Sequence, residues 1–147
     1  MLNNAWEGYH CCLFAYGQTG SGKSYSMVGF GANQGIVPLV CNEIFNRIQN
    51  NQEPKVSFEV QFSMLEIYNE KVQDLMLMNQ KDRPAGGLKV RENKGEVYVQ
   101  DLSKHAVDSY QRISEKMDQG YTNRSIGATH MNQTSSRAHT IITIEFK

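Results

Sequence analysis

The sequence has few cysteines, and their arrangement excludes two common kinds of site. It holds three cysteines, Cys11, Cys12 and Cys41, and no two of them form a C-x-x-C pair. The odd number and the spacing argue against a disulfide framework or a zinc site. The four histidines are scattered and also lack the spacing of metal ligands. We therefore expect the three thiols to be buried as small hydrophobic groups.

The chain also lacks an excess of either charge and any long apolar run. Lys plus Arg number 15, Asp plus Glu number 15, and the formal net charge is zero, which gives no general attraction to nucleic acid or to an anionic membrane. The longest apolar runs, such as CCLFAY, are too short to span a bilayer, and MLNNAWEGYH lacks the regions of a signal peptide. We expect a soluble intracellular protein with no nucleic-acid partner and no segment inserted in a membrane.

The hydrophobic pattern predicts alternating strands and helices in the first half of the chain. The apolar run from His10 to Tyr16 predicts a strand buried on both faces of a sheet. Apolar residues at helical spacing predict a helix from about Ile36 to Gln49, with Pro38 tolerated in its first turn. Strict alternation from Val56 to Met64 predicts a strand with one polar face that continues through LEIY.

The second half predicts a hairpin, a helix and a final strand. NEKVQDLML indicates a short helix, NQKDRPAGG an exposed loop, and LKVREN with EVYVQDL around NKG a hairpin. Asp108 and Gln111 resemble a capping box that opens a helix ended by Gly120. Residues 121–139 are polar and aperiodic and predict a loop, whereas TIITIEF predicts a strand. Together these elements indicate an α/β layered domain with a mixed sheet.

A glycine-rich stretch follows the first predicted strand and fits a phosphate-binding loop. Its letters, GQTGSGKS, match G-x-x-x-x-G-K-[ST] at each specified position. Glycines let the backbone curl so that successive N–H groups point at phosphate oxygens, and the next helix adds its N-terminal dipole. Lys23 would reach the β and γ phosphates, and the Ser24 hydroxyl would ligate Mg²⁺. Tyr25 could stack on an adenine or simply pack beside the helix. The expected nucleotide-binding residues are Gly17, Gln18, Thr19, Gly20, Ser21, Gly22, Lys23, Ser24 and Tyr25.

A second polar stretch, NQTSSRAH at residues 132–139, lies directly before the last predicted strand. It supplies hydroxyls, an amide and a positive charge, which are the groups that a loop sensing a γ-phosphate needs. FAYGQTGSGKSYSM followed by NRSIGATHMNQTSSRAH resembles the motor domain of the kinesins, and most closely the kinesin-three class. LEIYNEKVQDL and LKVRENKGEVYVQDLSKHAV lie between them in the order and spacing of that family. The resemblance covers nearly the whole chain.

The resemblance implies a P-loop NTPase fold, with a layered mixed β-sheet and flanking helices, that binds ATP and Mg²⁺. Asn132, Ser135 and Ser136 match residues around the γ-phosphate, the metal and the attacking water, so Ser24 and Ser135 are the expected metal ligands. Arg137 matches an arginine that pairs with a glutamate of the family's second switch. Lys94, at the hairpin tip, falls in a loop that touches tubulin in relatives, or is a solvated turn lysine.

The sequence departs from the family pattern in two ways. Ala138 replaces the family's serine before the final histidine, and the second switch, D-x-x-G-x-E, does not occur in these 147 residues. Residues 1–147 are therefore expected to be a partial motor domain, the nucleotide-binding core, without the early strand, the second switch and the relay helix.

The resemblance implies a microtubule-stimulated ATPase that moves along microtubules in the cytoplasm, associated with the cytoskeleton, with tubulin as its partner. Two alternatives stay open: a non-motile nucleotide-binding interaction module and an inactive truncated motor product. A P-loop kinase or an unrelated GTPase would explain residues 17–24 but leave NQTSSRAH unexplained. The sequence does not indicate cargo, direction of travel or oligomeric state.

Overall fold

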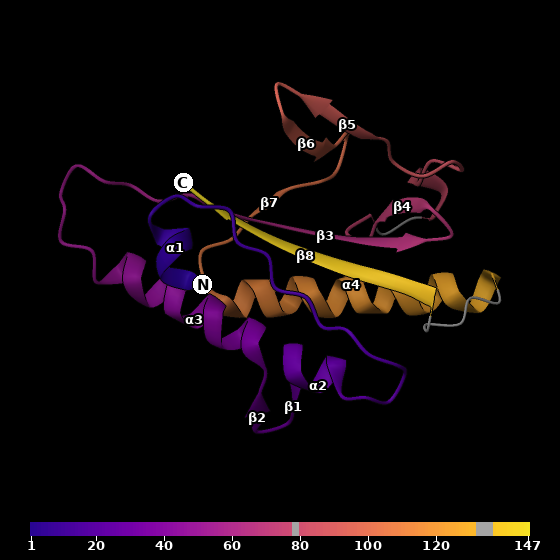
Figure 1. Cartoon of the computed structure of the whole chain (residues 1–147), viewed down its shortest axis with the longest axis horizontal. Coiled ribbons are helices and arrows are strands. Elements are labelled where there is room, and N and C mark those ends of the chain that lie inside the picture. Colours follow the sequence, from indigo (N-terminus) through magenta and orange to yellow (C-terminus); the bar gives the residue numbers. More distant parts are fainter. Residues whose placement is uncertain (78–79, 132–136) are drawn as a thin grey trace. The chain divides into compact units, whose positions relative to one another are not determined.

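The structure, a computed structural model, describes residues 1–77, 80–131 and 137–147 (Figure 1). The chain divides into two compact units, Met1–Gln52 and Glu53–Lys147. None of the helices in these described ranges is long and apolar enough to cross a membrane.

The first unit consists of short elements around one longer helix. Its elements, in chain order, are α1 (Leu2–Trp6), α2 (Lys23–Met27), β1 (Gly29–Phe30), β2 (Asn33–Gln34) and α3 (Ile36–Gln49). β1 and β2 pair antiparallel within the stretch GFGANQG. Close to that hairpin, a Cβ at Gly35 would lie 2.5 Å from the carbonyl carbon of Met27, so only glycine fits there.

The helix α3 has the bounds predicted from its apolar spacing. Pro38 lies in the first turn, where its missing N–H has no helical partner to lose. Its buried residues are Pro38, Cys41, Ile44 and Phe45, which recur at three- and four-residue intervals along one side. Near the other end, the Asn50 amide donates to the carbonyl oxygen and to the side-chain oxygen of Asn46, both at 2.9 Å.

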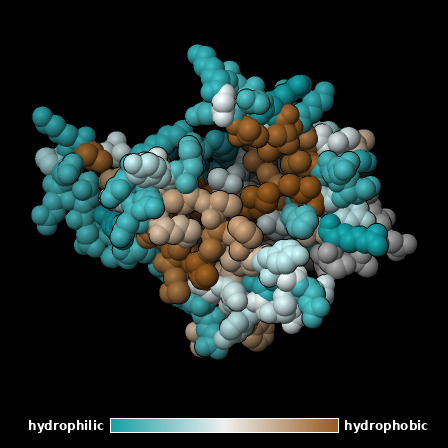
Figure 2. Space-filling view, viewed as in Figure 1, coloured by the Kyte–Doolittle hydropathy of each residue, from teal (hydrophilic) through white to brown (hydrophobic). Residues whose placement is uncertain are grey.

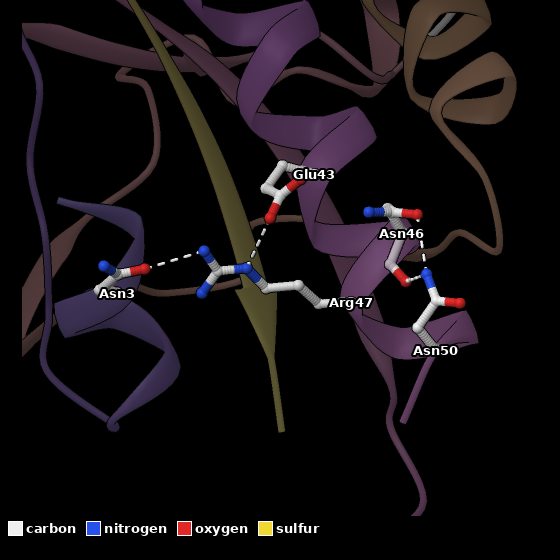
Figure 3. Close-up of polar contacts among 5 residues, drawn as sticks. All are labelled: Asn3, Glu43, Asn46, Arg47 and Asn50. Carbon is white, nitrogen blue, oxygen red and sulfur yellow. Dashed lines mark hydrogen bonds and ion pairs between the residues drawn. The ribbon is translucent and has the colours of Figure 1, made fainter. Parts of the chain in front are cut away.

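Arg47 links α3 to α1 in the first unit (Figure 3). Its Nε donates to Glu43 Oε1 at 2.8 Å, and another guanidinium nitrogen donates to Asn3 Oδ1 at 2.8 Å. The guanidinium also lies 5.7 Å from the centre of the Trp6 ring, within cation–π range. The hydrogen bond from Arg47 lowers the pKa of Glu43. A single arginine therefore contacts both helices.

The predicted strand at residues 10–16 is wrong. This segment has no regular secondary structure and its residues are exposed, with Phe14 at 80% and Tyr16 at 95%. A strand buried on both faces needs hydrogen-bonded neighbours, and none of the strands in the described residues pairs with this segment. The expected burial of all three cysteines is wrong for the same reason, because Cys11 and Cys12 lie here and are exposed. Cys41 is buried, which raises the pKa of its thiol to about 11.

The second unit contains a four-stranded sheet built on β3 (Val60–Tyr68). β8 (Ala138–Phe146) pairs with β3 along its whole length, from Val60 opposite Phe146 to Tyr68 opposite Ala138. β4 (Lys71–Asp74) and β7 (His105–Ala106) share the other edge of β3. All these pairings are antiparallel. β3 starts later than the predicted strand, and its centre is buried on both faces, so the predicted polar face is wrong.

The predicted helix at residues 69–77 is also wrong, because this stretch contains β4. Asn69 and Glu70 have φ values of 48° and 61°. Two successive residues with positive φ are typical of a type I′ turn, whose twist matches that of the two strands it joins. The turn folds β4 directly back on β3, with Lys71 opposite Tyr68. The hairpin predicted around NKG is confirmed as β5 (Val90–Asn93) paired with β6 (Glu96–Val99). Between them and β4 lies the short 3-10 helix η1 (Gln80–Asp82).

The helix α4 (Tyr110–Met131) is longer than predicted. Its N-terminus is capped by Ser109 rather than Asp108, because the Ser109 hydroxyl accepts a hydrogen bond from the Arg112 N–H at 3.4 Å. The helix continues through Gly120 and includes much of the predicted loop. A Cβ at Gly120 would collide with the Met64 sulfur and lie 2.9 Å from Met76 Cε. Gly120 is therefore a close-packing position between α4 and β3, not a helix end.

The core of the second unit joins α4, β3 and the end of β4. Its most buried side chains include Phe62, Met64, Leu75 and Ile113. Asp74, only 1% exposed, accepts hydrogen bonds from two backbone N–H groups, those of Met76 and Ser103, both at 2.8 Å. Large hydrophobic side chains are also exposed in both units, and Figure 2 shows hydrophobic surface in brown on the face viewed.

Candidate nucleotide site

The predicted phosphate loop lies in the first unit and has the backbone shape that its glycines allow. Gly17, Gly20 and Gly22 have φ values of 154°, 82° and 92°, in the region that favours glycine. Gly22 is also the residue that precedes α2. Among the described residues, Ser21 is the one residue of 17–22 whose backbone N–H donates to a backbone carbonyl, that of Gln18 at 3.1 Å. The other amides of this exposed loop can therefore donate to anionic oxygens.

The side chains of Ser21 and Lys23 lie close to the backbone of the loop. A Cβ at Gly17 would lie 2.5 Å from Ser21 Oγ, and the φ of 154° at Gly17 is one that residues with a side chain rarely adopt. Lys23 Nζ donates to the carbonyl oxygens of Gly17 and Gln18, the latter at 2.8 Å. These bonds fold the ammonium back over the loop. They place the positive charge beside the same backbone that supplies the N–H donors.

Ser24 and Tyr25 follow in the first turn of α2. Both are exposed, and Tyr25 is 56% exposed. The Tyr25 ring therefore does not pack against its own unit as a buried residue would, which leaves its face accessible to a planar group. No group of three or more His, Cys, Asp or Glu residues that could hold a metal ion occurs in the part of the chain that the structure describes.

The second polar stretch, residues 132–139, lies largely outside the described residues. Asn132, Ser135 and Ser136 belong to the stretch 132–136, which the structure does not describe. Arg137 is described, is exposed, and directly precedes β8. Ala138 begins that strand opposite Tyr68 of β3. Residues 17–25 belong to the first unit and Arg137 to the second.

Sequence reasoning missed a set of polar contacts that hold α4 on the sheet. Arg124 Nε donates to Glu66 Oε1 of β3 at 2.9 Å, and the Glu66 side chain is only 6% exposed. Asn123, which is buried, donates through its amide to the Leu75 carbonyl at 2.7 Å. In the sequence, Asn123 and Arg124 appear only as NR within a polar stretch, and such a stretch by itself predicts a solvated loop. The pairing partners lie far apart in sequence, so no local pattern predicts them.

Burial also changes the titration of two side chains near this contact region. Burial lowers the pKa of Arg83, and the negative charges of Asp74 and Glu66 oppose that change. The pKa of His105 is lowered by burial and by the positive charge of Lys116, against a smaller opposite effect of Asp74. The neutral imidazole is therefore the favoured form in the folded unit.

Comparisons with known proteins agree over the whole chain. A family model described as the kinesin motor domain matches residues 1–147. Kinesin-related protein 1 of Dictyostelium discoideum is 51% identical over 150 residues, covering 99% of this chain and 7% of that protein. The kinesin-like protein KIF1C of Homo sapiens is 51% identical over 150 residues, with 99% of this chain and 13% of that protein covered. The kinesin-like protein unc-104 of Caenorhabditis elegans is 49% identical, with 98% and 9% covered. The predicted resemblance to the kinesin-three class is confirmed.

Solved structures give the same result for the fold. A fast kinesin, described with its ATPase mechanism and its interactions with microtubules, has a TM-score of 0.88 and 36% identity, covering 99% of this chain and 41% of that one. KIF14 with AMP-PNP in complex with a microtubule has a TM-score of 0.83 and 41% identity, covering 99% and 40%. The predicted α/β fold of P-loop NTPase type is confirmed. The chain spans well under half the length of these relatives.

Proposed function

Because the chain belongs to the kinesin motor domain family, we propose that it forms the ATP-binding core of a motor that couples ATP hydrolysis to movement along microtubules. The observation that carries this proposal is the geometry of residues 17–24: a curled glycine loop, exposed backbone amides, and a lysine held over the loop. Relatives of this family have been solved with AMP-PNP or ADP in complex with a microtubule, which supports both the nucleotide and the partner.

The residues present fit a nucleoside triphosphate with Mg²⁺. The positive φ values of Gly17, Gly20 and Gly22 curl the exposed loop, and its backbone N–H groups would donate to phosphate oxygens. Ser24, in the first turn of α2, would hold Mg²⁺ through its hydroxyl, together with the hydroxyl of Ser135 from the second polar stretch. When bound, the metal would neutralise negative charge on the β and γ phosphates. Tyr25 is exposed and would stack on the adenine.

Lys23 has a specific task in this proposal. Its ammonium donates to the Gly17 and Gln18 carbonyls, and a bound triphosphate would draw it onto the β and γ phosphate oxygens. Two hydrogen bonds from the ammonium to neutral carbonyl oxygens would then be exchanged for bonds to anionic oxygens, in which donor and acceptor are both charged. Without nucleotide, Lys23 is therefore hydrogen-bonded to the backbone of the loop. With nucleotide, the same ammonium would bind the phosphates.

The stretch before β8 would act on the γ-phosphate. We assign Asn132, Ser135 and Ser136 to the γ-phosphate, the metal and the attacking water, and Arg137 to an ion pair with a glutamate elsewhere in the motor. Ala138 lacks the hydroxyl that the family has there, and removes one possible hydrogen bond from the start of β8. We further propose that Lys94, exposed at the turn between β5 and β6, contacts tubulin, which would place the protein in the cytoplasm on microtubules.

The proposal is tested by measuring ATP binding and ATP hydrolysis by the full-length protein, with and without microtubules. We expect hydrolysis that microtubules stimulate. Replacing Lys23 with alanine removes charged hydrogen bonds worth about 1.5–3 kcal/mol each, which corresponds to about a tenfold or greater loss of ATP affinity. Lys55→Ala is the matched control, because Lys55 is an exposed lysine outside the loop and should leave ATP affinity unchanged.

The outcomes separate the proposal from its alternatives. Failure to bind ATP at all would overturn the nucleotide site. ATP binding that depends on Lys23, without hydrolysis or microtubule stimulation, would instead favour a non-motile interaction module or an inactive truncated product.

A further inference from the structure

The hairpin formed by β5 and β6 has little support from packing. All four residues of β5 are exposed, and so are the first three of β6, including Val97 at 70%. Among the described strands, β5 and β6 pair only with each other. A two-stranded hairpin by itself is marginally stable in water. The orientation of this hairpin therefore depends on how its two ends are attached to the rest of the second unit.

The chain enters the hairpin from a backbone contact with β4. The Leu88 N–H donates to the Val72 carbonyl oxygen at 2.7 Å, and the two residues form an antiparallel bridge. Gly87, directly before Leu88, has a φ of 77°, and a Cβ there would lie 2.7 Å from the same carbonyl oxygen. A glycine at this position therefore allows the first strand of the hairpin to start close against β4.

The chain leaves the hairpin through a contact with the same strand. At the base of the hairpin, the Gln100 N–H donates to the Lys89 carbonyl oxygen at 2.9 Å. The Ser103 N–H then donates to Asp74 Oδ2 at 2.8 Å. Asp74 lies two residues after Val72, and two residues of a strand span nearly 7 Å. The two ends of the hairpin are thus attached to neighbouring points of β4.

We propose that Asp74 is a positioning residue for this hairpin, and that it sets how Lys94, in the turn between β5 and β6, is presented to tubulin. This inference rests on the proposed contact of Lys94 with tubulin. The Asp74 side chain is only 1% exposed, and a charged acceptor makes its bond to Ser103 stronger than a bond between neutral groups. The other carboxylate oxygen accepts from the Met76 N–H at 2.8 Å, which fixes the carboxylate itself.

The test is the microtubule-stimulated ATPase of the full-length protein. The KM for microtubules reports the contact with tubulin, whereas kcat and ATP affinity report the nucleotide site. Lys94→Ala should raise the KM for microtubules by up to about fivefold, the size of one exposed charge pair. Asp74→Asn should raise it by a similar factor, because the amide has one acceptor oxygen where the carboxylate has two, and should change kcat less than about twofold.

Gly87→Ala tests the other end of the hairpin and leaves Asp74 in place. The added Cβ would displace the strand from the Val72 carbonyl oxygen. We therefore expect the KM for microtubules to rise as it does for Asp74→Asn, with ATP affinity in the absence of microtubules unchanged. Each variant is first checked for folding by circular dichroism and thermal melting.

Double variants separate positioning from stability. If Asp74 acts through Lys94, adding Asp74→Asn to Lys94→Ala should raise the KM for microtubules less than about twofold further. Added to Lys55→Ala, which changes an exposed lysine outside the hairpin, Asp74→Asn should keep its full effect. Ile113→Val removes a methylene from the buried core of the same unit and is the stability control, which should leave this KM unchanged.

A raised KM for microtubules in Asp74→Asn and Gly87→Ala, with kcat retained and the effect of Asp74→Asn lost in the Lys94→Ala background, establishes the positioning role. An unchanged KM, a parallel loss of ATP affinity, or full additivity with Lys94→Ala overturns it. Failure of both variants to fold also overturns it, because the two contacts would then serve stability alone. If Lys94→Ala by itself leaves the KM unchanged, the proposed tubulin contact fails and the inference fails with it.

Discussion

Replacing Gly17 with alanine tests whether the shape of the phosphate loop is what binds the nucleotide. Gly17 has a φ of 154°, and its Cβ would lie 2.5 Å from Ser21 Oγ. A residue with a side chain held in such a conformation costs about 1–3 kcal/mol. The alanine loop would relax away from this shape, and the nucleotide would have to restore it. We therefore expect ATP affinity to fall by about 5- to 150-fold, because each 1.4 kcal/mol is a factor of about ten.

Two further glycines separate backbone strain from the steric contact. Gly20 has a φ of 82° within the loop, and Gly8 a φ of 93° outside it, and a Cβ at either would meet nothing within 4 Å. Gly20→Ala should weaken ATP binding less than Gly17→Ala, because it adds strain without the contact to Ser21. Gly8→Ala should leave affinity unchanged. Titration of a fluorescent ATP analogue measures all three. An unchanged affinity for Gly17→Ala, or an equal loss for Gly8→Ala, would refute the reasoning.

Three more predictions test burial and charge. An alkylating reagent at neutral pH should label Cys11 and Cys12 in the folded protein, and should label Cys41 only after denaturation, which mass spectrometry of the peptides checks. The pKa of His105 in the folded protein is below its ordinary value of 6.5, so on acidification the unfolded chain takes up a proton before the folded one does. The free energy of unfolding should therefore fall as the pH drops below about 6.5. In urea titrations, His105→Gln should reduce this dependence of the free energy of unfolding on pH. Asp74→Ala leaves two backbone amides without their acceptor. It should lower the free energy of unfolding, measured by urea titration, by about 3–6 kcal/mol, at about 1.5–3 kcal/mol for each bond to a charged group, and Asp74→Asn should lower it less.

The elements that were predicted well from the sequence are those whose conformation is determined by neighbouring residues. The helix at residues 36–49 follows from a run of apolar residues at helical spacing, and the hairpin around NKG follows from glycine in a tight turn. The glycine loop at residues 17–22 has the positive φ values that its motif requires. In each case, neighbouring residues carry enough information to select the backbone conformation.

The failures come from information that neighbouring residues do not carry. The turn at Asn69 and Glu70 has positive φ at both positions without any glycine, so the stretch after it looked helical rather than like a returning strand. The apolar run at residues 10–16 looked like a buried strand, yet burial depends on partners, and the described strands do not pair with it. The buried partner of Arg124 lies on β3, far away in sequence, so a polar helix looked like a loop.

At Gly120, the local helix propensity and the packing against a distant residue favour different structures. The low propensity of glycine favours a helix end, whereas the packing against Met64 favours a glycine inside the helix. A glycine within a helix costs about 1 kcal/mol relative to alanine, which is why it usually marks a helix end. Here alanine would collide with Met64, and overpacking of a core costs about 1–3 kcal/mol, so the distant contact outweighs the local preference. The helix then continues to Met131, immediately before the stretch predicted to sense the γ-phosphate. One turn after this close approach, Arg124 Nε donates to Glu66 Oε1 of β3 at 2.9 Å.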